Sequence, residues 1–269
     1  MPKNTEALDS TALITGASSG IGEALAHCFA RAGHRLVLVA RSEGKLRELA
    51  AKLKEAHGTQ VTVRPADLAV PGAAQALAVA LRRAKRQVDI LVNNAGVLEQ
   101  GLFTGIPAAR HQELIALNIA GLTAMLSAFV PAMVQRGQGR VLNVASIAAF
   151  QPVPGLASYA ATKAYVLSLT ESLAVELQGS GVTATALCPG ITATAMLSTA
   201  AASHAELNKL PGFLIGDADD VATHGYKACM AGHVIVVPGA INRAATIAGR
   251  ATPKWLLRRL SGTFARKLV

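Results

Sequence analysis

The sequence contains few cysteines, and none lies near another. Cys28, Cys188 and Cys229 are the three in 269 residues, and their spacing matches no metal-ligand or redox pair. Widely spaced thiols of this kind are typical of a reducing compartment. The stretch Met1–Ser10 is polar and lacks the apolar core of a secretory signal. We therefore expect a cytoplasmic protein without disulfides.

Aromatic and acidic residues are also scarce. Aromatic side chains make up 4% of the sequence, which argues against nucleic-acid binding through base stacking. None of the seven histidines has metal-ligand spacing, so we expect no metal. The net charge is +10, but residues 241–269 contain no acid and supply seven of these charges, Arg243, Arg250, Lys254, Arg258, Arg259, Arg266 and Lys267. The basic character is local, and we expect no nucleic-acid partner.

One long stretch, Leu114–Gln135, has no charged residue and is long enough to cross a bilayer. It contains Asn118, Gly121 and Pro131, and it lies within an alternation of strands and helices. A helix buried in the fold or at a subunit interface gives the same pattern. The buried helix is the stronger interpretation, and the membrane span is the alternative.

Short runs rich in branched apolar residues alternate with helical stretches along the chain. This alternation predicts an α/β fold with a doubly wound parallel sheet of seven strands flanked by helices. We assign residues 1–240 to one such domain and residues 241–269 to a basic extension. The seven predicted strands lie within Thr11–Thr15, Arg35–Ala40, Val61–Pro65, Val88–Gly96, Arg140–Ser146, Val182–Gly190 and His233–Gly239.

Two short patterns carry the first chemical signals. In "YAATK", Tyr159 and Lys163 are four residues apart, so a helix places them on one face. A cation beside a phenol lowers its pKa from about 10 and allows proton transfer nearer neutral pH. In "TGASSGIG", Gly16, Gly20 and Gly22 follow the first strand and precede a helix, as in a turn that binds a pyrophosphate. Either pattern alone also occurs without function, on solvated helices and in simple chain reversals.

The end of the second strand indicates which dinucleotide binds. An acid here holds the ribose hydroxyls of NAD, whereas a basic residue accommodates the 2′-phosphate of NADP. The chain has Ala40, Arg41 and Ser42, with no acid before Glu43, and Lys45 follows. Although Arg41 could be a solvated loop residue, we predict that NADP(H) is preferred over NAD(H).

Five motifs in order resemble those of the short-chain dehydrogenase/reductase family. They are "TGASSGIG", "NNAG" at Asn93–Gly96, "LNIAG" around Asn118, "NVASIAA" around Ser146, and "YAATK". The resemblance covers roughly Thr11 to Gly239. It implies a Rossmann-like fold, a nicotinamide cofactor, hydride transfer to or from a carbon that bears oxygen, and a homodimer or homotetramer.

The resemblance also implies catalytic roles for Asn118, Ser146, Tyr159 and Lys163. Tyr159 would exchange a proton with the substrate oxygen, and Lys163 would lower the pKa of Tyr159 and hold the nicotinamide ribose. Ser146, at the end of the fifth strand, would polarise the carbonyl group. Asn118 would anchor a water that passes protons to Lys163. Asn94 is expected to tie neighbouring strands together.

Further residues are implied as cofactor contacts. They belong to the glycine-rich turn, the ends of four other strands and the catalytic pair. The set comprises Gly16, Ser18, Ser19, Gly20, Ile21, Arg41, Asp67, Leu68, Asn93, Ala95, Gly96, Tyr159, Lys163, Pro189, Gly190, Ile191 and Thr194.

The expected substrate is a small hydrophobic ketone, aldehyde or secondary alcohol. In the family, the substrate wall comes from the loop after Ser146 and from the segment after Thr194. Lys209 is the one basic residue in these two segments, and their apolar members include Phe150, Val153, Leu156, Met196, Leu197 and Phe213. The sequence therefore favours an NADP(H)-dependent oxidoreductase. An NADP-binding sensor or scaffold without turnover is the alternative.

The C-terminal stretch Thr252–Val269 has the pattern of a basic amphipathic helix. Its apolar residues fall within one helical arc, and its arginines fall on the other side. Such a helix can make weak contact with an anionic membrane surface. It can equally pack on the protein body or on a neighbouring subunit, and we favour packing.

Overall fold

The computed structural model describes residues 10–193, 215–252, 255 and 257. Seven parallel strands form one sheet in the order β3-β2-β1-β4-β5-β6-β7. The strands are β1 (Thr11–Thr15), β2 (Arg35–Ala40), β3 (Val61–Pro65), β4 (Ile90–Asn93), β5 (Gly139–Val144), β6 (Val182–Leu187) and β7 (Ile235–Val236). The prediction of a seven-stranded, doubly wound parallel sheet in a Rossmann-like fold is confirmed.

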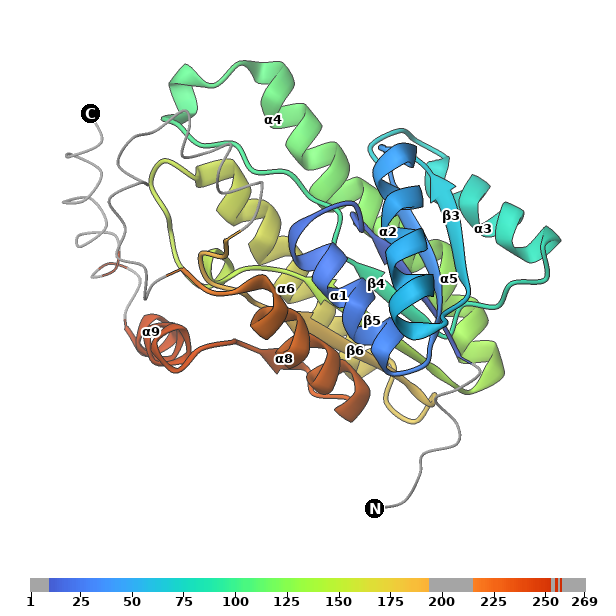
Figure 1. The fold of residues 1–269 in the computed structure, drawn as a ribbon. Coiled ribbons are helices and arrows are strands. Elements are labelled where there is room, and N and C mark those ends of the chain that lie inside the picture. Colours follow the sequence, from blue (N-terminus) through green and yellow to red (C-terminus); the bar gives the residue numbers. More distant parts are fainter. Residues whose placement is uncertain (1–9, 194–214, 253–254, 256, 258–269) are drawn as a thin grey trace.

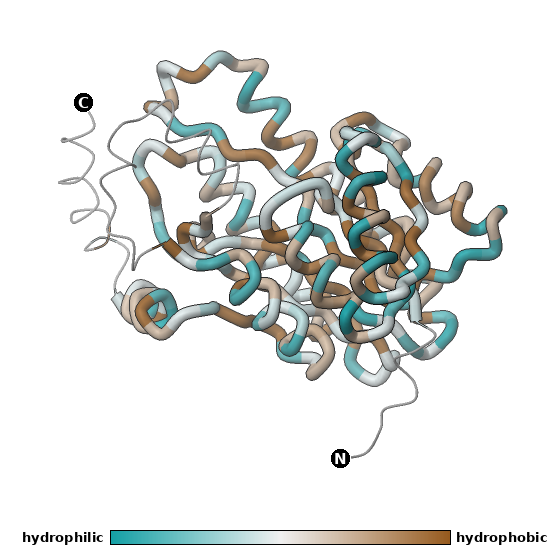
Figure 2. Tube along the Cα trace, in the orientation of Figure 1, coloured by the Kyte–Doolittle hydropathy of each residue, from teal (hydrophilic) through white to brown (hydrophobic). Residues whose placement is uncertain are grey.

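Helices cover both faces of the sheet (Figure 1). One face packs against α1 (Gly20–Arg31), α2 (Glu43–His57) and α8 (Ala218–Ala231). The other face packs against α3 (Ala73–Arg83), α5 (Leu122–Arg136) and α6 (Ala157–Glu176). Successive side chains of a strand therefore enter different cores. Leu13 lies in the core covered by α3, α5 and α6, whereas Ala12 and Ile14 lie in the core covered by α1, α2 and α8. Because both faces are covered, the strands are continuous apolar runs, brown at the centre of Figure 2.

The strand order reverses between β1 and β4. The chain runs outward through β1, β2 and β3, and then returns to place β4 on the other side of β1. The loops after β1 and β4 consequently diverge to opposite faces of the sheet. In open α/β sheets, a ligand binds in the crevice that opens at such a point, beyond the carboxyl ends of the strands.

The uncharged stretch around Leu114–Gln135 is helical throughout and packs on the sheet. It comprises the end of α4 (Ala108–Ile115), a π-helical segment at Ala116–Gly121, and α5. By length and composition the helix at Ala108–Arg136 could cross a membrane. However, its residues Met125, Phe129 and Met133 are buried in the core against the sheet. Its apolar character is therefore used in packing, as the buried-helix interpretation expected.

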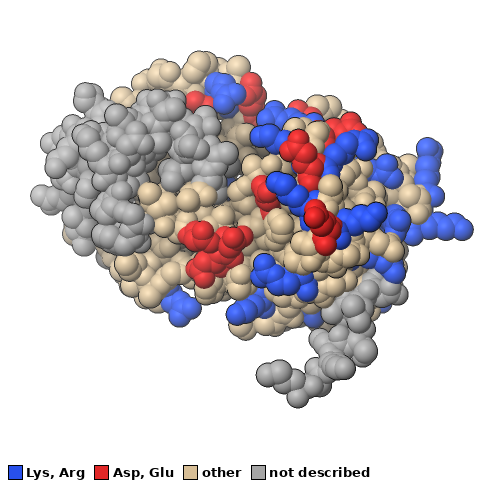
Figure 3. All heavy atoms as spheres, viewed as in Figure 1, with Lys and Arg blue, Asp and Glu red and all other residues tan. Residues whose placement is uncertain are grey.

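The predicted amphipathic helix at Thr252–Val269 lies almost entirely outside the described residues. The structure describes α9 (Ala240–Ala251), which begins where the predicted extension begins. The body also has a basic run of its own at the end of α3, where Arg82, Arg83, Lys85 and Arg86 are exposed. Figure 3 shows basic side chains gathered at the edge where α3 lies, and mixed acidic and basic side chains over α2.

Close packing at the start of α1 gives the first testable prediction. A Cβ added at Gly22 would overlap the Gly16 carbonyl oxygen and the Asn94 amide nitrogen, whereas one at Gly44 of α2 would meet nothing within 4 Å. We expect Gly22→Ala to lower the free energy of unfolding by about 3 kcal/mol or more. Gly44→Ala should raise it by about 0.5–1 kcal/mol. Urea unfolding of both variants checks this, and equal effects would contradict the proposed packing.

Candidate functional site

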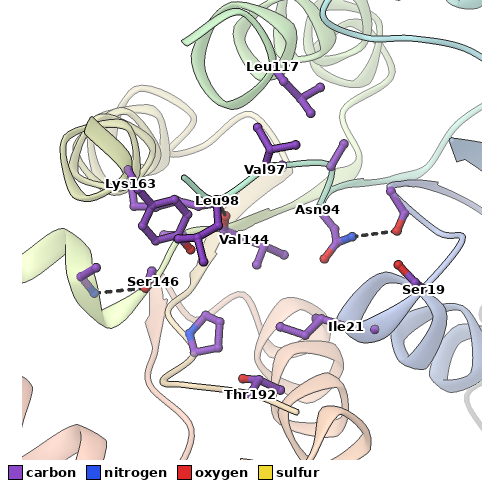
Figure 4. Close-up of a pocket in the computed structure, with 18 of the residues that line it drawn as sticks. Ser19, Ile21, Asn94, Val97, Leu98, Leu117, Val144, Ser146, Lys163 and Thr192 are labelled. Atoms are coloured by element: carbon purple, nitrogen blue, oxygen red, sulfur yellow. Dashed lines mark hydrogen bonds between the residues drawn. The ribbon is translucent and has the colours of Figure 1, made fainter. Parts of the chain in front are cut away.

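A cleft of about 650 Å³ lies at the carboxyl ends of the strands, at the point where the strand order reverses. One end is formed by the turn after β1, and the other by Ser146, Tyr159 and the segment Pro189–Thr192 after β6. Figure 4 shows Ser19 and Ile21 on one side of this cleft and Ser146 and Lys163 on the other. Residues far apart in the sequence thus form one continuous site.

The glycine-rich turn is attached to the end of β4. Thr15 Oγ1 donates to the Val92 carbonyl oxygen at 3.2 Å and accepts from the amides of Asn94 and Ala95, each at 3.0 Å. Asn94 Nδ2 donates back to the carbonyl oxygens of Thr15 and Gly16, each at 3.1 Å. Asn94 thus ties neighbouring strands together, as its sequence position suggested.

This turn is suited to a pyrophosphate. Gly16 and Gly20 have φ values of +64° and +58°, in the left-handed region, and the turn leads directly into the N-terminus of α1. Ser18, Ser19, Gly20 and Ile21 line the cleft. Backbone N–H groups at a helix N-terminus attract anions through the helix dipole.

The end of the cleft beside β2 carries cations. Arg41, Ser42 and Lys45 line it, and opposite them are Ala66, Asp67 and Leu68 after β3. Arg41 is exposed and makes no hydrogen bond or ion pair with the described residues. Its guanidinium is therefore available to an anionic ligand. Asp67 Oδ1 instead accepts a hydrogen bond from the Ala69 amide at 3.0 Å, which fixes the turn after β3.

Ser146 lies two residues beyond β5 and is buried, with 8% of its surface exposed. It caps the 3₁₀ helix η4 (Ile147–Phe150), because its Oγ accepts from the Ala148 amide at 3.1 Å. The Ser146 side chain also faces the Tyr159 hydroxyl closely enough to favour the phenolate and oppose a rise in the pKa of Tyr159. The amide occupies an acceptor position on Oγ, so the hydroxyl proton remains free to be donated.

Tyr159 and Lys163 lie on the same face of α6, as their spacing predicted. The Lys163 ammonium is 5.7 Å from the centroid of the Tyr159 ring. Lys163 is 6% exposed, and its Nζ donates to the Val144 carbonyl oxygen at 2.8 Å. Burial disfavours the charged form and lowers the pKa of Lys163 from 10.5 to about 8.

The pKa of Tyr159 does not shift in the predicted direction. Burial raises this pKa above its ordinary value, and the nearby Ser146 side chain opposes that rise. The predicted lowering of this pKa by Lys163 is therefore wrong for the chain alone, where desolvation of the phenolate dominates. The ammonium is directed instead to the backbone carbonyl of Val144.

Asn118 lies behind the cleft, in the π-helical segment between α4 and α5, and is 2% exposed. Its Oδ1 accepts from the Val97 amide at 2.9 Å, and its Nδ2 donates to the Val97 carbonyl oxygen at 2.9 Å. Nδ2 also donates to Thr162 Oγ1 of α6 at 3.2 Å. Gly96 lies between Asn118 and Lys163. A Cβ added at Gly96 would be 3.2 Å from Asn118 Oδ1 and 3.5 Å from Lys163 Nζ.

Asn93 differs from its prediction. Ala95 and Gly96 line the cleft, but Asn93 does not. Its Nδ2 donates to Asn143 Oδ1 at 2.9 Å, and Asn143 Nδ2 donates to Thr170 Oγ1 at 2.9 Å. Asn93 thus links β4 to β5 and α6 inside the core. Because successive side chains of a strand point to opposite faces, the place of Asn93 in the same motif as Ala95 and Gly96 does not put its side chain in the cleft.

Some predicted and some unpredicted residues complete the cleft. Pro189, Gly190 and Ile191 line it as expected, together with Val153 and Leu156. Thr194, Met196, Leu197, Lys209 and Phe213 lie outside the described residues. Sequence patterns missed Val97, Leu98, Gln100, Leu117 and Gln151, which also line it. The described residues contain no group of three or more side chains able to hold a metal ion.

A doubly wound parallel sheet with a glycine-rich turn at its reversal point defines a dinucleotide-binding α/β protein. Residues 10–205 match the model of the short chain dehydrogenase family. The protein is therefore a member of the short-chain dehydrogenase/reductase family and an oxidoreductase by that membership.

Known proteins support this assignment. The chain is 38% identical to the oxidoreductase UcpA of Salmonella typhimurium over 192 residues, which are 71% of this chain and 72% of that protein. It also resembles a short-chain dehydrogenase from Sphingobium yanoikuyae solved in complex with NADPH, at 37% identity and a TM-score of 0.80 over 89% of this chain and 92% of that one. A bulky-bulky ketone specific alcohol dehydrogenase from Comamonas testosteroni matches at 32% identity and a TM-score of 0.76, over 90% and 92%.

The buried ammonium of Lys163 makes the stability of the protein depend on pH. Its pKa is about 8 in the folded chain and 10.5 ordinarily, so between these values the unfolded chain binds more protons and stability rises with pH. Lys163→Met removes this contribution. Relative to the variant, the wild-type protein should gain up to about 3 kcal/mol in free energy of unfolding from pH 8 to pH 10.5.

Urea unfolding of the wild-type protein and Lys163→Met across this range tests the prediction. At pH 7 we expect the variant to be the more stable of the two, because a buried charge costs more than its hydrogen bond returns. A stability difference that stays constant from pH 7 to pH 10.5 would contradict the lowered pKa.

Proposed function

We propose that the protein is an NADP(H)-dependent oxidoreductase that acts on a hydrophobic ketone, aldehyde or secondary alcohol. The observation that carries this proposal is the meeting of Ser146, Tyr159 and Lys163 at one end of a cleft whose other end holds the exposed Arg41. This placement of the residues suits a dinucleotide that would extend between the two ends of the cleft, with its reactive ring beside the three catalytic side chains.

The catalytic side chains handle the proton. When bound, the nicotinamide supplies or accepts the hydride. The Tyr159 hydroxyl gives its proton to the carbonyl oxygen of the substrate in the reductive direction, and accepts it back in oxidation. The Ser146 hydroxyl donates a hydrogen bond to the same oxygen and stabilises its developing negative charge. The raised pKa of Tyr159 keeps the phenol protonated, as a general acid requires.

Lys163 and Asn118 support Tyr159. The Lys163 ammonium lies 5.7 Å from the Tyr159 ring centroid, beside the phenol, without lowering the pKa of Tyr159 in the chain alone. Lys163 lines the cleft and would hold the ribose hydroxyls of a bound cofactor, as the family resemblance implies. Asn118 holds the backbone of Val97 on both its N–H and C=O, which fixes the cleft wall facing Lys163.

The preference for NADP(H) rests on the end of β2. Arg41 and Lys45 line the cleft there, and Arg41 has no partner among the described residues. A guanidinium forms paired hydrogen bonds to a phosphate, so Arg41 suits the 2′-phosphate of NADP. The NADPH complex of the related Sphingobium protein is in keeping with this choice.

The substrate end of the cleft is largely apolar. Leu98, Val153, Leu156 and Ile191 line it. This surface suits a hydrophobic carbonyl compound, and the related Comamonas enzyme is specific for ketones with two bulky substituents.

We extend the proposal to a cytoplasmic homo-oligomer, because the three thiols are free and apolar side chains such as Val134 and Val175 are exposed on α5 and α6.

Removing the phenolic hydroxyl tests the chemistry. Tyr159→Phe should lower kcat with a hydrophobic ketone and NADPH by about 10²- to 10⁴-fold, because no general acid remains. NADPH should still bind, since the ring is kept. Tyr165→Phe is the matched control on the same helix: its hydroxyl bonds to Thr123 at 3.0 Å, away from the cleft.

Steady-state kinetics and NADPH fluorescence titration give the two readouts. Activity retained in Tyr159→Phe would rule out Tyr159 as the acid. A wild-type protein that binds NADPH but reduces no ketone in a broad panel would favour the sensor alternative.

Removing the guanidinium of Arg41 tests the cofactor choice. Arg41→Ala should raise the KM for NADPH about tenfold and leave the KM for NADH unchanged, because only NADPH has the 2′-phosphate. Arg47→Ala is the control, since Arg47 is an exposed arginine of α2 that pairs with Glu43 outside the cleft. Equal losses for both cofactors would contradict the assigned contact.

A further inference from the structure

The helix α9 lies against the wall of the cleft that follows Ser146. It packs on η4. Gly249 of α9 is buried and faces Gln151, the residue after η4, because a Cβ at Gly249 would lie 3.3 Å from Gln151 Oε1. Gln151 lines the cleft. In Figure 1, α9 lies at the edge of the fold beyond α8, at the end of the described chain.

Arg250 connects this helix to two other elements. The central carbon of its guanidinium lies 5.4 Å from the centroid of the Phe150 ring, at the end of η4. Its Nη2 lies 3.3 Å from Glu171 Oε1 of α6, the helix that carries Tyr159 and Lys163. One side chain thus joins α9, η4 and α6.

The segment that Arg250 contacts determines the position of Ser146. Ser146 caps η4 through its Oγ and the Ala148 amide, and the Ala149 amide donates to the Ser146 carbonyl oxygen at 3.0 Å. Ile147 and Ala148 of η4 line the cleft. A displacement of η4 would therefore move both the substrate wall and the hydroxyl that polarises the carbonyl group.

We propose that Arg250 is a positioning residue that holds η4 against α6, and so fixes Ser146 and Gln151 for substrate binding. This inference rests on the proposed function, and it makes α9 part of the substrate site although no residue of α9 lines the cleft. Arg250 belongs to residues 241–269, which the sequence assigned to a separate extension.

The size of the effect follows from the exposure of the contacts. Arg250 and Glu171 are 54% and 38% exposed, so their ion pair is weak, and a cation beside an exposed ring is similarly weak. Loss of the guanidinium should leave the fold intact and change local opening and substrate binding by about tenfold or less.

Hydrogen exchange tests the inference in the protein without substrate. In Arg250→Ala, the amides of Ala148 and Ala149 should exchange up to about tenfold faster than in the wild-type protein. The matched control is Arg243→Ala, which removes an exposed arginine of α9 whose side chain has no hydrogen bond or ion pair with the described residues. It should leave these amides unchanged. This readout requires no turnover, so it stands even if the proposed function fails.

Kinetics with NADPH and a hydrophobic ketone give the second readout. Arg250→Ala should raise the KM for the ketone several-fold while NADPH affinity is unchanged, and Arg250→Lys should restore part of the loss because it keeps a cation between Phe150 and Glu171. Unchanged exchange of Ala148 and Ala149 in Arg250→Ala would overturn the inference. So would a ketone KM equal to that of Arg243→Ala.

Discussion

The attachment of the glycine-rich turn to the end of β4 is the constraint on which the site depends. Thr15 and Asn94 exchange hydrogen bonds across the point where the strand order reverses, and Gly22 permits α1 to approach the turn closely. These contacts bring the N-terminus of α1 to the cleft and place Ala95 and Gly96 beside it. The side chains proposed to be catalytic, which follow β5 or lie on α6, then face the same space because parallel strands end at one edge of the sheet.

The end of the cleft proposed to be catalytic combines groups whose burial is unfavourable for folding. Lys163 is buried, and among the described residues its ammonium donates a hydrogen bond to the Val144 carbonyl oxygen. Burial also raises the pKa of Tyr159, which keeps a proton available on the phenol. We infer that stability is lost in order to hold an ammonium and a phenol side by side at the proposed site of proton transfer. The rest of the fold has one apolar core on each face of the sheet, and these two cores supply the stability that this arrangement lacks.

Sequence patterns predicted the sheet well because its strands are buried on both faces. β1, β2 and β3 have the predicted bounds, whereas β7 is shorter than its apolar run. Spacing also placed Tyr159 and Lys163 on one helical face. Two features could not be obtained from sequence. The pKa direction of Tyr159 depends on desolvation, and the contacts of Arg250 join three elements that lie far apart in the chain.

Following the hydride itself tests the proposed reaction. NADPH that carries deuterium at the transferable position of the nicotinamide ring is incubated with the protein and a hydrophobic ketone, and the alcohol product is analysed by mass spectrometry and NMR. The proposed hydride transfer predicts one deuterium on the carbon that bears the hydroxyl group, on one face only. Oxidation of NADPH without deuterium in the alcohol, or deuterium on both faces equally, would contradict it.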